Sequence, residues 1–505
     1  MTRIAMLCAI ALVAAAPVAL AQVPKAPPGL KLYKPPANLR SYEQGELIWA
    51  RKSENPLPQA SRTWTLLYRS TSLRGKAIGV SGFLMLPKGK PPKRGWPVVS
   101  WAHGTSGIAD SCAPSRDPDG DYTAYAAPQF GAWLRAGYAI ANTDYEGLGT
   151  PGVHPYVVGR SEGRGVVDIV RASRQLDGRL ARRYVIAGHS QGGHAALFAA
   201  ALAPKRAPEL RLRGVAAFAP ASHLDLLSRA LPNFTSPSGL SGLAALVVRG
   251  LSSVYPEIKP RLIASDRALA LLPQVDRVCL GALNRASSFG GIAPADLVRP
   301  GADMDPLNRR LAQQNPDLKI AAPILLAQGL ADTTVPPPFT DQLEGELRAR
   351  RNRVRHLTYP EVDHVGIVAA ADQATRRFFR TRLQMGRDGR RGRRAGRSAD
   401  TKRNGAVLVA FRYYERTEPM FSNVLRDADL LDSARQAVAP LQTYLDEAAE
   451  VLIAGRHARG RRRQLLRGAL RHALDFSTWR SLSTNGIARS DAAKLSTVLV
   501  ETAAR

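Results

Sequence analysis

The pattern of apolar and polar positions between residues 64 and 383 predicts an α/β protein. Residues 64–86 alternate with a period of two and are rich in β-formers, which predicts antiparallel strands. Residues 97–102 form a continuous apolar run, which is typical of a strand buried on both faces. Further along, strand-like segments (138–142, 184–187, 214–219, 320–327 and 354–359) alternate with helix-like segments (126–136, 163–176, 191–202, 339–350 and 366–383). Such alternation predicts a parallel sheet covered by helices, with ligands bound at the carboxyl ends of its strands.

Three segments depart from this alternation. Residues 22–62 are rich in Pro, Lys and polar groups, and we expect them to form an extended leader of the core domain, which ends at residue 385. Residues 223–310 hold Leu, Pro, Ser and Gly in helical patches, which predicts an insertion between two core strands. An Arg/Gly-rich linker (386–405) then leads into a small all-α region (406–505), whose predicted helices cover 406–414, 432–453, 461–474 and 489–502.

The first 21 residues have the features of a secretory signal peptide (1–21). Arg3 supplies a positive charge, residues 4–18 are apolar, and Ala-Leu-Ala at 19–21 fits the small-x-small rule for cleavage. The apolar stretch is short for a membrane span, and no later segment reaches about 18 uninterrupted apolar residues. We therefore expect a secreted or periplasmic protein without a transmembrane segment.

Composition limits the function further. The 505 residues have a hydrophobic content of 45%, which argues against a disordered chain, and a net charge of +30. The basic excess is spread along the sequence. Its densest run, residues 387–403, has no interleaved aromatic residues and no recognisable reading helix. We interpret this run as a solvated linker and expect no nucleic-acid partner.

Two cysteines, Cys112 and Cys279, remain once the signal peptide is removed. Export to an oxidising compartment favours a disulfide between them, and the alternative is two free buried thiols. The sequence has no His/Cys/Asp cluster with convincing metal-ligand spacing and no phosphate-binding loop. We expect neither a metal nor another cofactor.

The pattern Gly-x-Ser-x-Gly occurs at residues 188–192, between a predicted strand and a predicted helix. In this setting it is typical of a nucleophile elbow, a tight turn that holds the serine at strained backbone angles. Gly188 and Gly192 remove side chains that would collide there, and the helix N-terminus favours developing negative charge. The pattern predicts Ser190 as a nucleophile. The alternative is a Gly-rich turn with an incidental serine.

A serine nucleophile needs a base that an acid orients, and in this architecture the order is Ser, then Asp or Glu, then His. Asp332 follows a predicted strand directly, whereas Asp341 falls inside a predicted helix and Asp363 has no strand immediately before it. His364 follows the last predicted strand, and His356 lies within that strand. We therefore predict Asp332 as the acid and His364 as the base.

The oxyanion of an acyl-transfer reaction needs two backbone N–H donors. One is expected from Gln191, the residue after the nucleophile. The other is expected from the loop 103–107 that follows the predicted strand 97–102, with Gly104 and Thr105 as candidates. His103 precedes the serine in the chain, so we expect it to shape this loop.

The segments that carry this chemistry resemble the secretory lipase family of α/β-hydrolases. The matching segments are 101–105, 112–115, 144–149, 188–194, 328–332 and 363–364, within a resemblance that covers about residues 40–383. The resemblance implies the α/β-hydrolase fold, with the insertion as a lid over an acyl pocket. It also implies an exported serine hydrolase of small-molecule or lipid acyl esters and a disulfide matching Cys112 and Cys279. Residues 144–149 are either a substrate contact or a structural turn.

Residues 406–505 resemble a different family, the ligand-binding C-terminal region of tetracycline-repressor-like (TetR) regulators. The resemblance is carried by 418–421, 424–429 and 473–482, and no helix-turn-helix precedes it, so DNA recognition is not implied. The tail is a true fusion, a dimerisation bundle or a gene-model error.

The function expected from these features is an exported carboxylic ester hydrolase, a lipase or esterase with a Ser190–Asp332–His364 triad. Two alternatives stay open. One is a serine peptidase or aminopeptidase of the same fold, and the other is a ligand-responsive regulator carried by the C-terminal helices.

Overall fold

The computed structural model describes residues 24–53, 57–117, 121–383 and 460–503, with a few single residues between 411 and 453. The chain divides into two compact units, Met1–Gly386 and Arg387–Arg505, which are described separately below. The predicted signal peptide and the predicted linker lie outside the described residues, as do most of the predicted helices 406–414 and 432–453.

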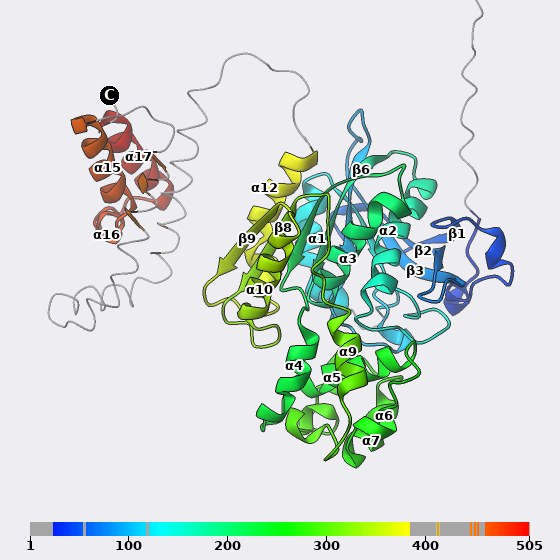
Figure 1. Cartoon of the computed structure of the whole chain (residues 1–505). Helices are drawn as coiled ribbons and strands as arrows, with labels where there is room; N and C mark the ends of the chain where they lie inside the picture. Colours follow the sequence, from blue (N-terminus) through cyan, green and yellow to red (C-terminus); the bar gives the residue numbers. More distant parts are fainter. Residues whose placement is uncertain are drawn as a thin grey trace, which may run out of the picture. The chain divides into compact units, whose positions relative to one another are not determined.

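A mixed sheet of nine strands, within the described ranges, forms the centre of the first unit (Figure 1). Its spatial order is β1-β2-β3-β5-β4-β6-β7-β8-β9. Pairing is antiparallel from β1 to β5 and parallel from β5 to β9. The strands are β1 (Leu47–Lys52), β2 (Ala60–Thr71), β3 (Ala77–Pro87), β4 (Trp96–Ala102), β5 (Ala139–Thr143), β6 (Leu180–His189), β7 (Arg211–Phe218), β8 (Ile324–Gly329) and β9 (Val354–Tyr359).

The central strands are buried on both faces, which explains their continuous apolar runs. Every residue of β4 and of β8 is buried. Alternate residues of a strand enter two different cores: Val98 packs with α2 (Gly159–Leu176) and α3 (Gln191–Arg206). Its neighbour Val99 packs with α1 (Asp121–Arg135) and α12 (Asp372–Leu383). Helices therefore cover both faces, as the alternation of segments predicts.

The helical insertion lies between β7 and β8 and has a hydrophobic core of its own, which includes Leu246, Leu251, Phe289 and Ile292. Figure 1 shows its helices gathered at one end of the unit. The helices are α4 (Leu224–Ala230), α5 (Leu240–Ser252), α6 (Pro260–Ile263), α7 (Asp266–Leu271), α8 (Leu280–Leu283) and α9 (Asp305–Ala312). The insertion thus extends slightly beyond the predicted end at residue 310.

Several predicted elements differ from the structure in their bounds, and three of the differences have a clear physical reason. The predicted leader contains β1, which lies at the edge of the sheet, where a short strand with polar residues is tolerated. The strand predicted from residue 320 begins at Ile324, directly after Pro323, whose missing N–H cannot join a ladder. The helix predicted over 366–383 is two helices, α11 (Ile367–Ala370) and α12. The remaining core helix is α10 (Pro337–Ala349), close to its predicted range.

Most of the described residues of the second unit are helical. α15 (Gly460–Leu474), α16 (Phe476–Thr484) and α17 (Arg489–Ala503) share a core that includes Leu466, Trp479 and Val500. α15 and α17 coincide with the predicted helices 461–474 and 489–502. None of the helices in the described part of the chain is long and apolar enough to cross a bilayer.

Candidate active site

Ser190 stands at the turn between β6 and α3, with φ of 58° and ψ of −120°. A non-glycine residue rarely adopts positive φ, so neighbouring contacts must hold it there. A Cβ at Gly188 would lie 2.0 Å from the carbonyl oxygen of Gly192, and a Cβ at Gly192 would lie 1.9 Å from that of Ala102. Glycine is therefore required at both positions, which is the geometry of a nucleophile elbow.

The structure brings Ser190, His364 and Asp332 together from three separate loops. His364 Nε2 lies 2.9 Å from Ser190 Oγ, and His364 Nδ1 lies 2.7 Å from Asp332 Oδ2. Asp332 follows β8 and His364 follows β9, and both strands run parallel to β6 through β7. The three side chains meet because the carboxyl ends of parallel strands lie at one edge of the sheet.

Asp332 is buried and well supplied with donors. The N–H groups of Thr334 and Val335 each donate to Asp332 Oδ1 at 2.8 Å, and Gln328 Nε2 donates to Oδ2 at 3.1 Å. Burial by itself raises the pKa of Asp332, but the hydrogen bond with His364 and these backbone donors bring it below its usual value. The carboxylate is therefore held charged, which suits an acid that orients an imidazole.

His189 fixes the loop that carries His364. Its Nε2 donates to the carbonyl oxygen of His364 at 2.7 Å, and the two rings lie 4.7 Å apart. Burial, aided by the nearby His364, lowers the pKa of His189 to about 3, so the ring stays neutral. A neutral donor at this place adds no positive charge that would compete with a proton on His364.

The loop after β4 lies against the elbow. The carbonyl oxygen of His103 would lie 2.5 Å from a Cβ at Gly192, so the loop and the start of α3 are in close contact. His103 is buried, burial lowers its pKa to about 4, and its ring packs 4.3 Å from that of Tyr145. Thr105 Oγ1 lies 2.6 Å from Tyr156 Oη. The loop that carries Gly104 and Thr105 therefore begins against the first turn of α3, and the second oxyanion donor stays a prediction for this loop.

The disulfide Cys112–Cys279 links this loop region to the insertion. A Cβ at Gly107 would lie 2.8 Å from Cys112 Sγ, and the N–H of Leu280 donates to the carbonyl oxygen of Ser106 at 2.9 Å. The insertion is thus attached covalently at Cys112, and a backbone hydrogen bond attaches it to the loop 103–107.

Residues 144–149 form a structural turn. Asp144 is buried and accepts hydrogen bonds from Ser81 Oγ and from the N–H of Ser115, while Glu146 accepts from Ser161 Oγ. Tyr145 has φ of 72°. Both carboxylates are occupied by the chain itself, which favours the structural interpretation over substrate contact.

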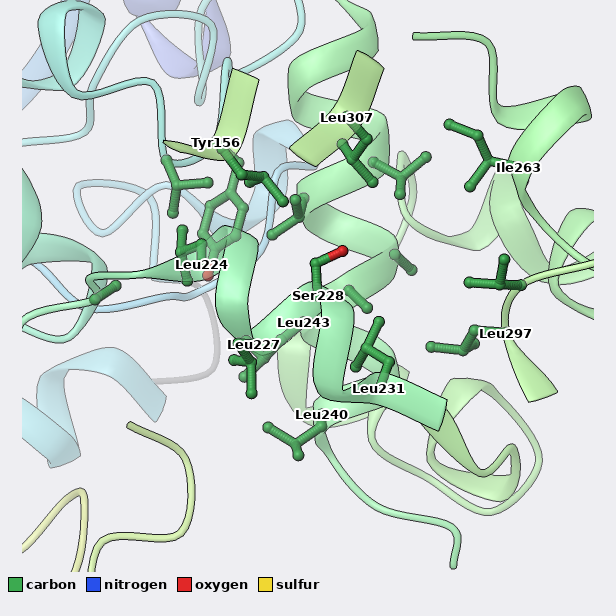
Figure 2. A pocket seen from close by; sticks show the side chains of 18 of the residues that line it. Tyr156, Leu224, Leu227, Ser228, Leu231, Leu240, Leu243, Ile263, Leu297 and Leu307 are labelled. Atoms are coloured by element: carbon green, nitrogen blue, oxygen red, sulfur yellow. The ribbon is translucent and has the colours of Figure 1, made fainter. Parts of the chain in front are cut away.

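Ser190 lines a large apolar pocket that extends into the insertion. Figure 2 shows side chains of the insertion, such as Leu227 and Leu243, around this pocket. The pocket has an empty volume of about 1160 Å³, part of it open to solvent. Leu224 and Leu227 of α4 and Leu243 of α5 line it from the insertion side, and Phe339 of α10 lines it from the core. Among the described residues that line it, none is charged.

Within the described ranges, no three His, Cys, Asp or Glu side chains are grouped so as to hold a metal ion. One buried group beside the site is not among the predicted residues: Glu162 of α2, which contacts Gln191. The sequence around it, Ser-Glu-Gly-Arg-Gly at 161–165, has no pattern that marks the carboxylate as part of a site.

The sequence and the fold are similar to those of known lipases. The sequence model of the family "Secretory lipase" matches residues 124–291. Lipase A of Moesziomyces aphidis is 28% identical over 45% of this chain and 49% of its own length. Lipase 4 of Candida albicans is 25% identical over 62% of this chain and 72% of its own length. This chain therefore spans about half of the first relative and rather more of the second.

The solved structure of Candida antarctica lipase A superposes with a TM-score of 0.55 at 21% identity, covering 66% of this chain and 80% of that chain. The first unit therefore has the α/β-hydrolase fold that the sequence predicts. The family match and the lipase names of the relatives point to the same class of protein as the Ser–His–Asp geometry does.

Proposed function

We propose that the protein is an exported serine hydrolase that cleaves carboxylic esters, with Ser190 as nucleophile. The observation that carries the proposal is the hydrogen-bonded chain from Asp332 through His364 to Ser190 Oγ, at 2.7 and 2.9 Å, beside an uncharged apolar pocket. The lipase relatives and the secretory lipase match support the same activity.

In the proposed mechanism, Ser190 Oγ attacks the ester carbonyl while His364 Nε2 accepts its proton. Asp332 orients the imidazole and stabilises its positive charge. The amides of Gln191 and of Gly104 or Thr105 bind the oxyanion. His364 then donates the proton to the leaving alcohol, which leaves an acyl group on Ser190. Water next attacks this acyl group while His364 accepts a proton from it, and return of the proton to Ser190 releases the acid.

The pocket supports acyl esters as the substrate class. Its lining is supplied mainly by Leu, Val and Ala side chains, which favour a hydrocarbon chain over a charged group. An aminopeptidase would need an acidic side chain for the substrate's ammonium group, and the described lining residues include none.

Hydrolysis of p-nitrophenyl esters of short and long acyl chains by the full chain and by Ser190→Ala tests this function. We expect Ser190→Ala to lose at least about 10³-fold in kcat, since removal of a triad member costs that much or more. Ser228→Ala is the matched control, because Ser228 also lines the pocket but lies on α4. Wild-type activity in Ser190→Ala would overturn the mechanism.

We also propose export through a signal peptide at residues 1–21, which the Cys112–Cys279 disulfide supports because such bonds persist in oxidising compartments. N-terminal sequencing of protein recovered outside the cytoplasm should begin at Gln22. A product that retains Met1 would contradict this proposal.

We further propose that residues 406–505 are a TetR-like helical region that joins two copies of the chain. Leu495, Val498 and Leu499 form an exposed apolar stripe on α17, and Leu465 of α15 is 55% exposed. Light scattering should give a dimer for the full chain and a monomer for Leu495→Glu combined with Leu499→Glu. A monomeric wild type would overturn the proposal.

A further inference from the structure

We propose that Glu162 is a positioning residue for the oxyanion site and acts through Gln191, an inference that rests on the proposed ester hydrolysis. Glu162 lies in the first turn of α2, and its side chain is completely buried. A buried carboxylate is costly unless hydrogen bonds satisfy its oxygens, so its partners indicate what it is for.

One oxygen of Glu162 holds the side chain of Gln191. Glu162 Oε1 accepts from Gln191 Nε2 at 2.8 Å and from the N–H of Val157 at 2.9 Å. Gln191 Nε2 also lies 2.9 Å from His154 Nε2. His154 Nδ1 faces the carbonyl oxygen of Glu146 at 2.9 Å and must donate to it. Burial lowers the pKa of His154, so the ring is neutral and its Nε2 accepts. Both amide hydrogens of Gln191 are therefore engaged.

The other oxygen of Glu162 holds the helix that carries Gln191. Glu162 Oε2 lies 3.2 Å from His194 Nδ1, and His194 Nε2 donates to the carbonyl oxygen of Gln314 at 2.8 Å. The N–H of His194 donates to the carbonyl oxygen of Ser190 at 3.1 Å, one turn into α3. A hydrogen bond between these facing atoms needs a proton between Glu162 Oε2 and His194 Nδ1. Although burial by itself raises the pKa of Glu162, its bonds to His194 and Gln191 bring it below the usual value.

This arrangement fixes the orientation of the peptide group between Ser190 and Gln191. The amide of Gln191 is the oxyanion donor at the nucleophile elbow, and its side chain is held at both hydrogens while the following turn is held through His194. Oxyanion donors act because they are aligned before the reaction begins. A displacement of about 1 Å can cost roughly 100-fold in rate. Glu162 is placed to prevent such a displacement, without touching the substrate.

Steady-state kinetics of the full chain on p-nitrophenyl butyrate tests the proposal. We expect Glu162→Leu to lower kcat about 10- to 100-fold and to leave KM within about threefold, since the loss falls on the transition state. We expect Glu162→Gln to recover most of kcat. Its amide oxygen still accepts from Gln191 and Val157, and its NH2 donates to His194 Nδ1.

A second variant removes the other partner of the contact between Glu162 and Gln191. Gln191→Leu keeps the backbone amide but removes the side chain that Glu162 holds. We expect it to lower kcat in the same way, and we expect the double variant with Glu162→Leu to lose little more than either single variant. Gln191→Leu also keeps the test decisive if Glu162→Leu does not fold.

The matched control is Asp168→Leu. Asp168 is also a buried carboxylate on α2, but it bonds Arg206 Nε at 2.8 Å and Ser70 Oγ at 2.7 Å, away from the elbow. We expect its kcat to match that of the wild type below the melting temperature.

The affinity for an alkyl boronic acid, which forms a tetrahedral adduct on a serine, should fall with kcat in Glu162→Leu but not in Asp168→Leu.

Three results would overturn the inference. The first is an unchanged kcat in both Glu162→Leu and Gln191→Leu, and the second is an equal loss of kcat in Asp168→Leu. The third is a rise in KM alone, which would mean that Glu162 and His194 hold the insertion through Gln314. In each case Ser190→Ala would still abolish hydrolysis. Hydrolysis that persists in Ser190→Ala would instead overturn the proposed function.

Discussion

At the scale of single residues, the proposed triad can be predicted from where its three residues stand in the sequence. The fold then brings their side chains together. Ser190 is identified by glycines that the elbow requires for steric reasons, and Asp332 and His364 by their places just after strands. Glu162 and His154 could not be found this way, because Gln191, which both contact, lies 29 and 37 residues away and no local pattern marks them. Burial of a polar group becomes visible once the tertiary packing is known.

Asp332→Asn should lower kcat roughly 10³- to 10⁴-fold while leaving the fold intact. An amide NH2 facing His364 Nδ1 favours the tautomer with its proton on Nε2, which cannot accept from Ser190. Ester hydrolysis and thermal melting of the variant check this. Asp341→Asn is the control, because Asp341 lies on the exposed side of α10. A loss of less than tenfold would contradict the role of Asp332.

Asp144 should make stability depend on pH. Burial raises its pKa to about 6, against the lowering effect of bonds from Ser115 and Ser81. The unfolded chain loses this proton near pH 4, so the unfolded state binds fewer protons than the folded state between about pH 4 and 6. The free energy of unfolding therefore falls as pH rises through that window, by roughly 3 kcal/mol for this group.

Urea denaturation of the wild type and of Asp144→Asn at several pH values measures this contribution. We expect the variant to lose the fall in stability between about pH 4 and 6, since its side chain does not titrate. The same pH dependence in both proteins would assign it to other groups.

At the scale of elements, strands buried on both faces and long amphipathic helices follow from local pattern. β4 and β9 lie within a residue of their predicted bounds, and α3 begins at the predicted residue Gln191. β1 is missed because a six-residue edge strand within a polar, Pro-rich segment leaves little apolar signal. The break between α11 and α12 is missed because apolar residues continue on both sides of it. Boundaries of this kind depend on contacts with other elements.

Removal of the disulfide should loosen the attachment of the insertion. The bond closes a loop with a sequence separation of 167 residues, so the double variant Cys112→Ser and Cys279→Ser should lose roughly 2–5 kcal/mol of stability. Two comparisons of melting temperature measure this loss: the variant against the wild type, and the wild type with a reductant against the wild type without it. An unchanged melting temperature in both comparisons would contradict the expectation.

At the scale of the whole molecule, the chain consists of two units, and the candidate site lies in the first. Residues of the described hydrophobic cores belong to one unit or the other, with Leu466 and Trp479 in the second. The net charge of +30 is therefore shared by an α/β-hydrolase unit and a helical unit, and it is no guide to the site.

Deletion of residues 387–505 should leave kcat and the melting temperature of the hydrolase unit unchanged within about twofold and a few degrees, since that unit has complete cores of its own. Ester hydrolysis and calorimetry of the shortened chain check this. A chain that aggregates or loses more than tenfold in kcat would show that the helical unit supports the first.

The sequence by itself determined the alternating α/β architecture, the nucleophile elbow and the order of serine, acid and base, because period, glycine sterics and strand ends are local properties. Tertiary structure alone decided that Ser190, His364 and Asp332 meet within hydrogen-bonding distance and that the insertion forms an apolar pocket beside them. It also decided that a buried Glu162 holds Gln191 in place. These features join residues far apart in the chain, and the contacts that create them exist only after the sheet has assembled.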